Sequence, residues 1–333
     1  MLLTVKDMSD LAIKTSGLRM VYNPGLFLPR KVGLENLDLE VPAGSIFGYL
    51  GRNGAGKTST IKILVGLQFA TAGAAWIRGE DVRASRTRRH IGFMPEEPYF
   101  YEYLTAEETL DFYGKLSGLD RATRQQRTAA LLAQFGLHDA RKAQLRTFSK
   151  GMRQRMGLAQ AVLHKPAVAI LDEPMSGLDP LGRREIRNLI LALRAEGCTV
   201  FFSSHILSDV EEICDRVCVI DHGRRVAEGP LSSLLTGKVI EVKLSAANLP
   251  REGAPGLAPL AVRAWHDGAL YHVLVDSEEK AQRVKELLEK AGGILRGMEP
   301  HKESLEEYFL RVTSTEASPV LSPTPSGEKA AKA

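Results

Sequence analysis

The sequence predicts an α/β fold built on a mixed sheet, followed by a small α+β domain. Three segments carry this prediction. Residues 51–58 are rich in glycine and lie between an apolar run and a helix-like segment, which gives the order strand, loop, helix. Residues 167–171 and 199–204 read as short strands, and their apolar side chains are typical of strands buried on both faces of a parallel sheet.

The glycine-rich segment fits the phosphate-binding pattern G-x-x-x-x-G-K-[ST] at every fixed position. Its glycines let the backbone turn several N–H groups toward phosphate oxygens, and the following helix adds the positive end of its dipole. We expect Lys57 to reach the β- and γ-phosphates and Thr58 to place its hydroxyl on Mg²⁺. The predicted phosphate-binding residues are Gly51, Asn53, Gly54, Ala55, Gly56, Lys57, Thr58 and Ser59.

Two carboxylates follow the run 167–171 directly. Open α/β sheets bind ligands at the carboxyl ends of their strands, so both side chains are expected at the site. Asp172 is the candidate for the Mg²⁺ shell, and Glu173 is the candidate base that orients and deprotonates a water molecule. His205 follows the strand 199–204 and is expected at the same edge, in contact with the γ-phosphate; the alternative is a structural histidine.

Composition excludes several other classes of protein. A chain of 333 residues is long enough for two domains, and a net charge of +4 is too small to indicate nucleic-acid binding. The three cysteines are not accompanied by further metal ligands, so buried free thiols are expected rather than a zinc site. No apolar run approaches the roughly 18–20 residues that span a bilayer.

A further motif lies between these segments, at residues 148–155. It resembles the signature of the ATP-binding cassette (ABC) ATPases, Leu-Ser-Gly-Gly-Gln followed one residue later by Gln-Arg. The chain keeps Ser149, Gly151, Gln154 and Arg155 and departs from the signature at Phe148, Lys150 and Met152. Residues 176–179 are similar to the D-loop of that family and residues 204–205 to its H-loop. The resemblance covers roughly residues 10–236.

The resemblance implies a P-loop ABC cassette with an N-terminal antiparallel β portion and a helical subdomain. It also implies ATP and Mg²⁺ as cofactors. Ser149, Gly151 and Asp179 would face the nucleotide of a second cassette. Tyr22 is the candidate for the aromatic ring that stacks on adenine, with Phe27 as its rival.

Glu96 stands where the family's Q-loop has a glutamine. A carboxylate can still ligate Mg²⁺ or accept a hydrogen bond from the attacking water, but it cannot donate one when it is ionised. The resemblance therefore places Glu96 among both the metal-binding and the nucleotide-binding residues.

The expected organisation has four parts. Residues 1–10 form a leader, and residues 11–237 form the ATP-binding domain, with its helical subdomain at about 97–165. Residues 238–313 form the accessory α+β domain, which contains strands, a hairpin and a helix at 278–290. Residues 314–333 form a tail whose composition predicts disorder.

The function implied is an ATP-hydrolysing subunit of an ABC transporter, resembling the ABC-2-type exporters. It would lie on the cytoplasmic face of the membrane and power a membrane-spanning permease on a separate chain. A second cassette is also required, and a homodimer is favoured over a heterodimer. The alternative is a non-transport ABC ATPase acting in translation or DNA repair. Such proteins usually carry two cassettes, a long coiled-coil insertion or a strongly basic surface, and none of these is visible.

Four aromatic residues lie directly after the Q-loop position, at 99–101 and 103. Pro98 and the flanking carboxylates indicate a loop, which cannot bury four rings by itself. The family's groove for a short cytoplasmic helix of the membrane subunit borders this region. We therefore expect at least two of these rings to be exposed, as anchors for the membrane partner.

Overall fold

The computed structural model describes residues 10–23, 30–235, 239–250 and 252–315, and the statements below concern these ranges. Residues 1–9 of the predicted leader, residues 316–333 of the predicted tail, and Phe27 lie outside them.

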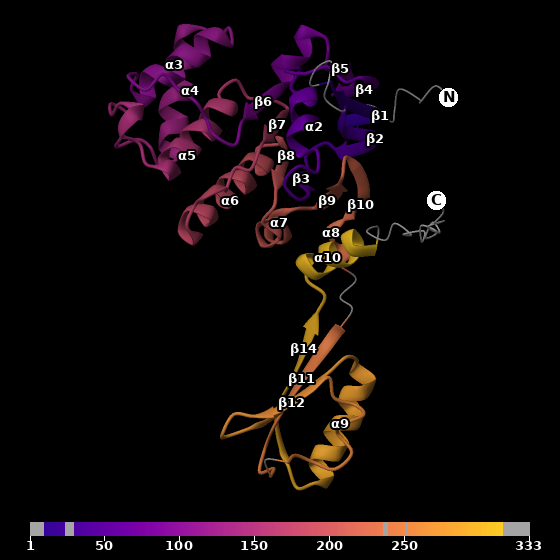
Figure 1. Ribbon diagram of the computed structural model, residues 1–333. Helices are drawn as coiled ribbons and strands as arrows, with labels where there is room; N and C mark the ends of the chain where they lie inside the picture. Colours follow the sequence, from indigo (N-terminus) through magenta and orange to yellow (C-terminus); the bar gives the residue numbers. More distant parts are fainter. Residues whose placement is uncertain (1–9, 24–29, 236–238, 251, 316–333) are drawn as a thin grey trace, which may run out of the picture. The chain divides into compact units, whose positions relative to one another are not determined.

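Contacts within the chain define two compact units. The smaller unit consists of Cys214–Arg216 and Gly229–Tyr308, and the larger unit contains the remaining described residues. Figure 1 labels the elements of both. The domain boundaries given above stay a prediction.

The larger unit contains a six-stranded sheet in which four neighbouring strands run parallel. The strand order is β10-β9-β3-β8-β7-β6, and the parallel neighbours are β3 with β8, β8 with β7, and β7 with β6. The bounds are β3 Ile46–Leu50, β6 Ile91–Met94, β7 Val168–Leu171, β8 Thr199–Ser204, β9 Arg216–Asp221 and β10 Arg224–Pro230. The two runs predicted to be buried strands are β7 and β8, and all of their residues are buried.

An antiparallel sheet packs against the larger sheet through shared apolar residues. Its order is β2-β1-β4-β5, with bounds β1 Leu11–Tyr22, β2 Lys31–Pro42, β4 Ala72–Ile77 and β5 Glu80–Asp81. Alternate side chains of β2, such as Leu37, Leu39 and Val41, join Phe47 of β3 in one hydrophobic cluster. Because one face of each sheet is apolar, the two sheets bury those faces in a shared core. The predicted mixed architecture is confirmed.

Helices connect the strands of the larger unit. They are α2 Lys57–Leu64, α6 Pro180–Ala195 and α7 Leu207–Ile213, with a short 3₁₀ helix at Ser85–His90. A separate helical region contains α3 Ala106–Leu116, α4 Arg121–Gln134 and α5 Lys150–Ala161, and Figure 1 shows these three helices grouped together. A second 3₁₀ helix, Leu145–Thr147, precedes α5. The predicted capping box at Thr105 and Glu108 starts α3, with both reciprocal hydrogen bonds formed.

The smaller unit is an antiparallel sheet with helices. Its strand order is β12-β13-β11-β14. The bounds are α8 Leu231–Leu234, β11 Val239–Ala247, β12 Arg263–His266, β13 Tyr271–Val275, α9 Glu278–Lys290 and β14 Ile294–Lys302. The last helix, α10 Leu305–Thr315, begins in this unit, and its residues from Phe309 on belong to the larger unit. The buried face of α9 packs on the sheet through Ala281, Val284 and Leu288, as its periodicity predicted. The sequence analysis did not predict strand β14.

Two further observations bear on the composition. The three cysteines are free; Cys214 and Cys218 are buried, and Cys198 is partly buried. Within the described ranges, no helix combines the length and the apolar character needed to cross a bilayer.

Candidate nucleotide site

The phosphate loop connects β3 to α2 and depends on glycine at its end. Gly56 precedes α2 with a φ of 111°, a conformation that residues with a side chain rarely adopt. A Cβ atom added there would lie 2.6 Å from the carbonyl oxygen of Gly33. The first N–H groups of α2 have no intrahelical partners, as at the start of any α-helix, and Gly56, Lys57 and Thr58 line the cavity described below.

Lys57 is held at the base of this loop. Its Nζ atom donates a 2.7 Å hydrogen bond to the carbonyl oxygen of Gly51 and lies 3.2 Å from Oε1 of Glu173. Both side chains are more than nine-tenths buried. An ion pair with so little exposure needs this precise hydrogen bonding, because removing either partner leaves a buried charge.

The strand ends bring the predicted acidic residues and His205 together. Glu173 has a φ of 47°, and its Oε2 atom lies 2.8 Å from Nδ1 of His205. Its carboxylate therefore lies between an ammonium group and an imidazole. The three predicted catalytic residues, Lys57, Glu173 and His205, form one contiguous cluster.

Ser203 joins the two acidic residues and was not singled out from the sequence. The backbone N–H of Glu173 donates to Oγ of Ser203 at 2.9 Å, and the Ser203 hydroxyl donates to Oδ1 of Asp172 at 2.6 Å. Burial raises the pKa of Asp172, whereas the interactions with the hydroxyls of Ser203 and Thr58 lower it in part. A hydroxyl residue near the end of an otherwise apolar core strand was the only available signal.

A cavity of about 420 Å³ lies over this cluster. Most of the predicted site residues line it, and three lining residues, Lys31, Gly33 and Arg52, were not predicted. The predicted residues that line it are Tyr22, Asn53, Gly54, Gly56, Lys57, Thr58, Ser59, Glu96, Glu173 and His205.

Tyr22 forms part of the cavity wall. Its hydroxyl lies 2.9 Å from Oγ of Ser59 and donates to Oε1 of Gln68 at 3.2 Å. The ring lies across Gly33, where an added Cβ atom would be 2.6 Å from the ring edge. The ring is thus fixed beside the phosphate loop, and its stacking on adenine stays a prediction.

Glu96 also lines the cavity. Its side chain is exposed, while its carbonyl oxygen accepts a 3.1 Å hydrogen bond from Nε2 of Gln154. Gln154 is buried and belongs to the segment that resembles the ABC signature. This bond ties the Q-loop position to α5.

The remaining predicted residues are not among those that line the cavity. Ser149 accepts a hydrogen bond from the backbone of Met152 and so caps α5, and Asp179 caps α6 through the N–H of Gly182. A Cβ atom on Gly151 would lie 3.9 Å from Leu178, so the start of α5 adjoins the turn 176–179. Ser149, Gly151 and Asp179 thus gather at a second place in the larger unit. Gly51, Ala55 and Asp172 do not line the cavity either, but they stay beside it, in the phosphate loop and directly after β7.

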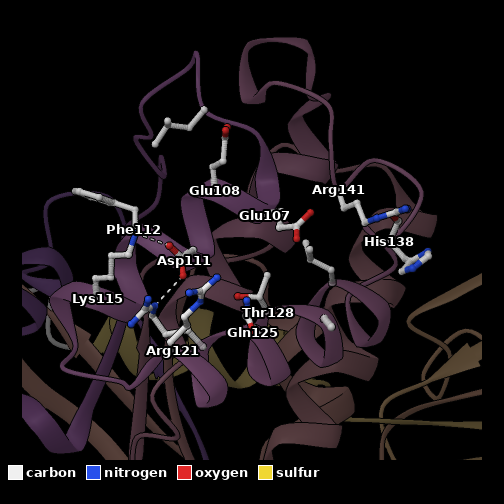
Figure 2. Close-up of a pocket in the computed structure, with 14 residues that line it drawn as sticks. Glu107, Glu108, Asp111, Phe112, Lys115, Arg121, Gln125, Thr128, His138 and Arg141 are labelled. Atoms are coloured by element: carbon white, nitrogen blue, oxygen red, sulfur yellow. Dashed lines mark hydrogen bonds and ion pairs between the residues drawn. The ribbon is translucent and has the colours of Figure 1, made fainter.

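A second cavity, of about 890 Å³, lies away from this chemistry, in the helical region. Figure 2 shows carboxylates of α3, Glu107 and Asp111, with basic side chains from α4 and from the loop that carries Arg141. Asp111 already binds Lys115 and Arg124, and these bonds lower its pKa. A wall of paired charges offers no phosphate-binding loop, so the smaller cavity is the candidate nucleotide site.

Comparisons with known proteins agree with this geometry. A family model described as ABC transporter matches residues 34–176. An uncharacterized ABC transporter ATP-binding protein of Synechocystis is 40% identical over 90% of this chain and 84% of its own length. The daunorubicin/doxorubicin resistance ATP-binding protein of Streptomyces peucetius is 36% identical over 91% and 92%.

Solved structures lead to the same family. The structure of an ATP-binding subunit of an ABC transporter is 32% identical, with a TM-score of 0.61, and the match covers 68% of this chain and 92% of that one. Since the sequence relatives match over most of their own length, the chain belongs to the ABC transporter ATP-binding proteins, which bind ATP and hydrolyse it.

Proposed function

We propose that this ATPase powers an exporter, by drawing two cassettes together around ATP and releasing them after hydrolysis. The observation that carries the proposal is the position of Glu173. Its carboxylate is held by Lys57 and His205 at the edge of the cavity that the phosphate loop encloses. A base, a phosphate-binding lysine and an imidazole are thereby gathered where a γ-phosphate would lie.

ATP would lie with its phosphates along the loop 51–58 and its adenine toward Tyr22. The N–H groups at the start of α2 would donate to the β- and γ-phosphates. Lys57 would exchange part of its contact with Glu173 for the γ-phosphate. Tyr22 is the candidate for the adenine contact, because its ring is fixed beside the loop by Ser59.

Mg²⁺ fits the oxygen atoms at this edge. Asp172 has a raised pKa because it is buried, so a neighbouring cation would favour its ionised form. The Thr58 hydroxyl hydrogen-bonds to it, and Glu96 lines the same cavity. Hard oxygen ligands of this kind suit Mg²⁺, which would neutralise charge on the phosphates. We propose Thr58, Asp172 and Glu96 as its protein ligands, directly or through water.

Glu173 is proposed to accept the proton of the attacking water. Its unusual backbone conformation is fixed by the bond from its N–H to Ser203, which aims the side chain into the cavity. His205 would contact the γ-phosphate and keep the carboxylate oriented through the 2.8 Å contact. These residues therefore position the base before the reaction, which lowers the entropic barrier.

The second cassette is proposed to be another copy of this chain. Ser149 and Gly151 lie at the exposed start of α5, next to Asp179 and away from the cavity of their own chain. A head-to-tail pair would bring them to the γ-phosphate bound by the partner. The positive end of the α5 dipole would then face an anion.

Export and membrane attachment rest on the relatives and on one surface. One relative, from Ralstonia nicotianae and 32% identical to this chain, is a Nod factor export ATP-binding protein, and we propose the same direction here. Tyr99, Tyr101 and Tyr103 are 84%, 58% and 75% exposed, whereas Phe100 is buried. The expected exposure is confirmed. We propose that these tyrosines bind the permease on the cytoplasmic face of the membrane.

The relatives give no support to the alternative in translation or DNA repair.

The test of the ATPase mechanism is Glu173→Gln. It should leave ATP binding nearly unchanged, lower turnover by roughly 10²-fold or more, and trap an ATP-bound dimer. Turnover is measured by phosphate release and the dimer by size-exclusion chromatography with multi-angle light scattering. Glu211→Gln, an exposed glutamate on α7, is the control. If Glu173→Gln keeps full turnover and shows no stabilised dimer, Glu173 is not the general base.

The permease surface is tested with Tyr99→Ala/Tyr103→Ala. The double variant should lose transport or assembly with the permease while keeping the ATPase rate of the isolated subunit. Leu116→Ala is the matched control, since Leu116 is 68% exposed on the same helical region. Normal transport by the double variant would remove this surface from the proposal.

A further inference from the structure

An arginine-rich segment of the larger unit takes no part in the nucleotide site. It includes the 3₁₀ helix Ser85–His90 and lies just before β6. The side chains of Arg83, Arg86 and Arg89 are all more than half exposed, and they are not among the residues that line the nucleotide cavity. Their charge is therefore available at the surface of the protein.

Nearby carboxylates neutralise this cluster only in part. Asp81 pairs with Arg83. The carboxylate of Glu80 lies within 3.6 Å of a guanidinium nitrogen of both Arg86 and Arg89. Since one carboxylate carries one charge, a guanidinium charge is left uncompensated between these three side chains. The segment thus presents positive charge to the solvent.

Two large apolar side chains are exposed beside the arginines. Leu67 and Phe69 follow α2 and are 68% and 69% exposed. Arg88, itself exposed, donates a 3.4 Å hydrogen bond to the carbonyl oxygen of Gly66, and Phe69 lines the same small hollow as Arg83. The fold therefore places apolar side chains and cations on one surface, although they come from separate segments of the chain.

The shape of this surface suits lipid headgroups better than a folded partner. The hollow that Phe69 and Arg83 line has a volume of about 60 Å³, which is too small to receive the row of side chains of a docking helix. A layer of lipid headgroups needs no preformed groove, because apolar side chains can enter between the headgroups. Exposed guanidinium groups can bind lipid phosphates, and their positive charge matches an anionic bilayer.

We infer that residues 66–69 and 83–89 form a lipid-binding surface, which contacts the anionic headgroups of the membrane directly. The arginines bind lipid phosphates, while Leu67 and Phe69 enter the headgroup layer. Two kinds of attraction act together here, and stable attachment to a bilayer usually takes two. This contact needs neither nucleotide nor permease, so it goes beyond the attachment through the tyrosines proposed above.

The first experiment measures how the full-length protein binds vesicles, without permease or nucleotide. Vesicles of phosphatidylcholine and phosphatidylglycerol should bind it, and this binding should weaken as salt is added. Vesicles of phosphatidylcholine alone should bind it much more weakly. Arg83→Gln/Arg86→Gln/Arg89→Gln should bind the anionic vesicles on the order of a hundredfold more weakly, because each basic residue at such a surface contributes about fivefold. Co-sedimentation over a range of lipid concentrations gives the partition coefficient.

The matched control removes the same amount of positive charge elsewhere. Arg121, Arg283 and Arg296 are exposed on α4, α9 and β14. Arg121→Gln/Arg283→Gln/Arg296→Gln should bind the anionic vesicles nearly as the parent does. The ATPase rate of the isolated subunit should stay unchanged in both triple variants, which checks that both are folded.

The second experiment changes the charge in the opposite direction. Glu80→Gln removes a negative charge that pairs with Arg86 and Arg89, so binding to the anionic vesicles should strengthen about fivefold. Glu279→Gln breaks an ion pair with Arg283 on α9 and should leave the binding unchanged. An unchanged or weaker affinity in Glu80→Gln would contradict the role assigned to the arginines.

The apolar contribution is tested by Phe69→Ala. This variant should bind the anionic vesicles more weakly at both low and high salt, because salt screens the attraction between charges but not the burial of an apolar ring. Leu116→Ala, at a side chain of similar exposure, is the control. Equal binding by these two variants would remove Phe69 from the surface.

Three further outcomes would overturn the inference. The parent binds both kinds of vesicle equally, the two triple variants lose the same affinity, or the variant at 83, 86 and 89 fails to assemble with the permease while the parent binds no lipid. The last result would assign the surface to a protein partner.

The proposed function is judged separately by Glu173→Gln, which should bind vesicles as the parent does. An active Glu173→Gln together with lipid binding removes the mechanism alone. A trapped dimer without lipid binding removes the lipid-binding surface alone.

Discussion

The reactive geometry at Glu173 is set by three residues that are distant in sequence. Ser203 binds its backbone, His205 binds one carboxylate oxygen, and Lys57 binds the other. A non-glycine residue with positive φ is uncommon and costs conformational energy, which these contacts offset. The direction of the carboxylate is therefore fixed by contacts within the chain, and its side chain is less than one-tenth exposed.

At the scale of residues, the sharpest prediction concerns Lys57. Lys57→Ala removes a phosphate contact used in both the ground and transition states, so ATP affinity and turnover should both fall. Loss of one charge-assisted hydrogen bond corresponds to roughly 10- to 100-fold weaker binding. The measurement is equilibrium titration with a fluorescent ATP analogue. Lys62→Ala, at an exposed lysine of the same helix, should bind normally. Normal affinity in Lys57→Ala would contradict the phosphate-loop assignment.

At the scale of elements, helix starts combine stability with the site. Thr105, Asp120, Ser149 and Asp179 each accept a hydrogen bond from a backbone N–H in the first turn that follows. Two of these caps, Ser149 and Asp179, are also predicted site residues. Capping and ligand binding use the same free N–H groups, so a cap next to an interface can serve both purposes.

Thr105→Ala tests a cap that has no proposed role in the site. It should lower the free energy of unfolding by about 1 kcal/mol, measured in urea, while ATP turnover stays unchanged. Ser117→Ala, at the other end of α3, caps no N–H group and should cost less. An equal loss in both variants would show that the cap does not stabilise α3.

The same cap should depend on pH. The hydrogen bond from the Thr105 backbone lowers the pKa of Glu108 below its ordinary value. A carboxyl group whose pKa is lowered by folding stabilises the fold fully when the pH is above its pKa in the unfolded chain. That stabilisation is lost as the pH falls through its lower pKa in the folded protein. The free energy of unfolding of Glu108→Gln should therefore be closer to that of the parent in acid than at neutral pH. The measurement is unfolding in urea at a series of pH values across that range.

At the scale of the whole molecule, two hydrophobic clusters of the described residues lie in different units. One includes Phe47 and Phe201 in the larger unit, and the other includes Val284 and Leu288 in the smaller. Each core is formed by residues of its own unit. Two cores of this kind favour two unfolding transitions rather than one.

Calorimetry with single core variants checks this expectation. Leu288→Ala should lower the free energy of unfolding of the smaller unit by about 2–5 kcal/mol, because Leu288 is fully buried in α9. Only the transition temperature of that unit should fall. Ile190→Ala, in α6, should lower only the transition temperature of the larger unit, because Ile190 is buried there. Added ATP should raise the transition of the larger unit alone. A single transition that responds to both variants would show that the units unfold together.

Much of the site could be predicted because its signals are contiguous. Lys57 and Thr58 follow from one unbroken loop pattern, since the residues that surround a phosphate there are neighbours in the chain. Asp172 and Glu173 follow from the end of a short apolar run, because parallel strands present their carboxyl ends at one edge. In the smaller unit, the helix at 278–290 followed from its periodicity, and the structure has α9 over the same residues.

Other features were decided by the tertiary structure. The strand β14 contains Gly297 and Pro300 and has a largely exposed surface, so it forms only because the edge of β11 pairs with it. Ser203 binds Glu173, and Lys150 lies on Gly177, because distant segments are packed together. Local sequence determines backbone propensity and the polarity of each face, but contacts between remote residues depend on strand order and close packing. The sequence therefore determined which groups are present for phosphate chemistry, and the tertiary structure decided which of them meet.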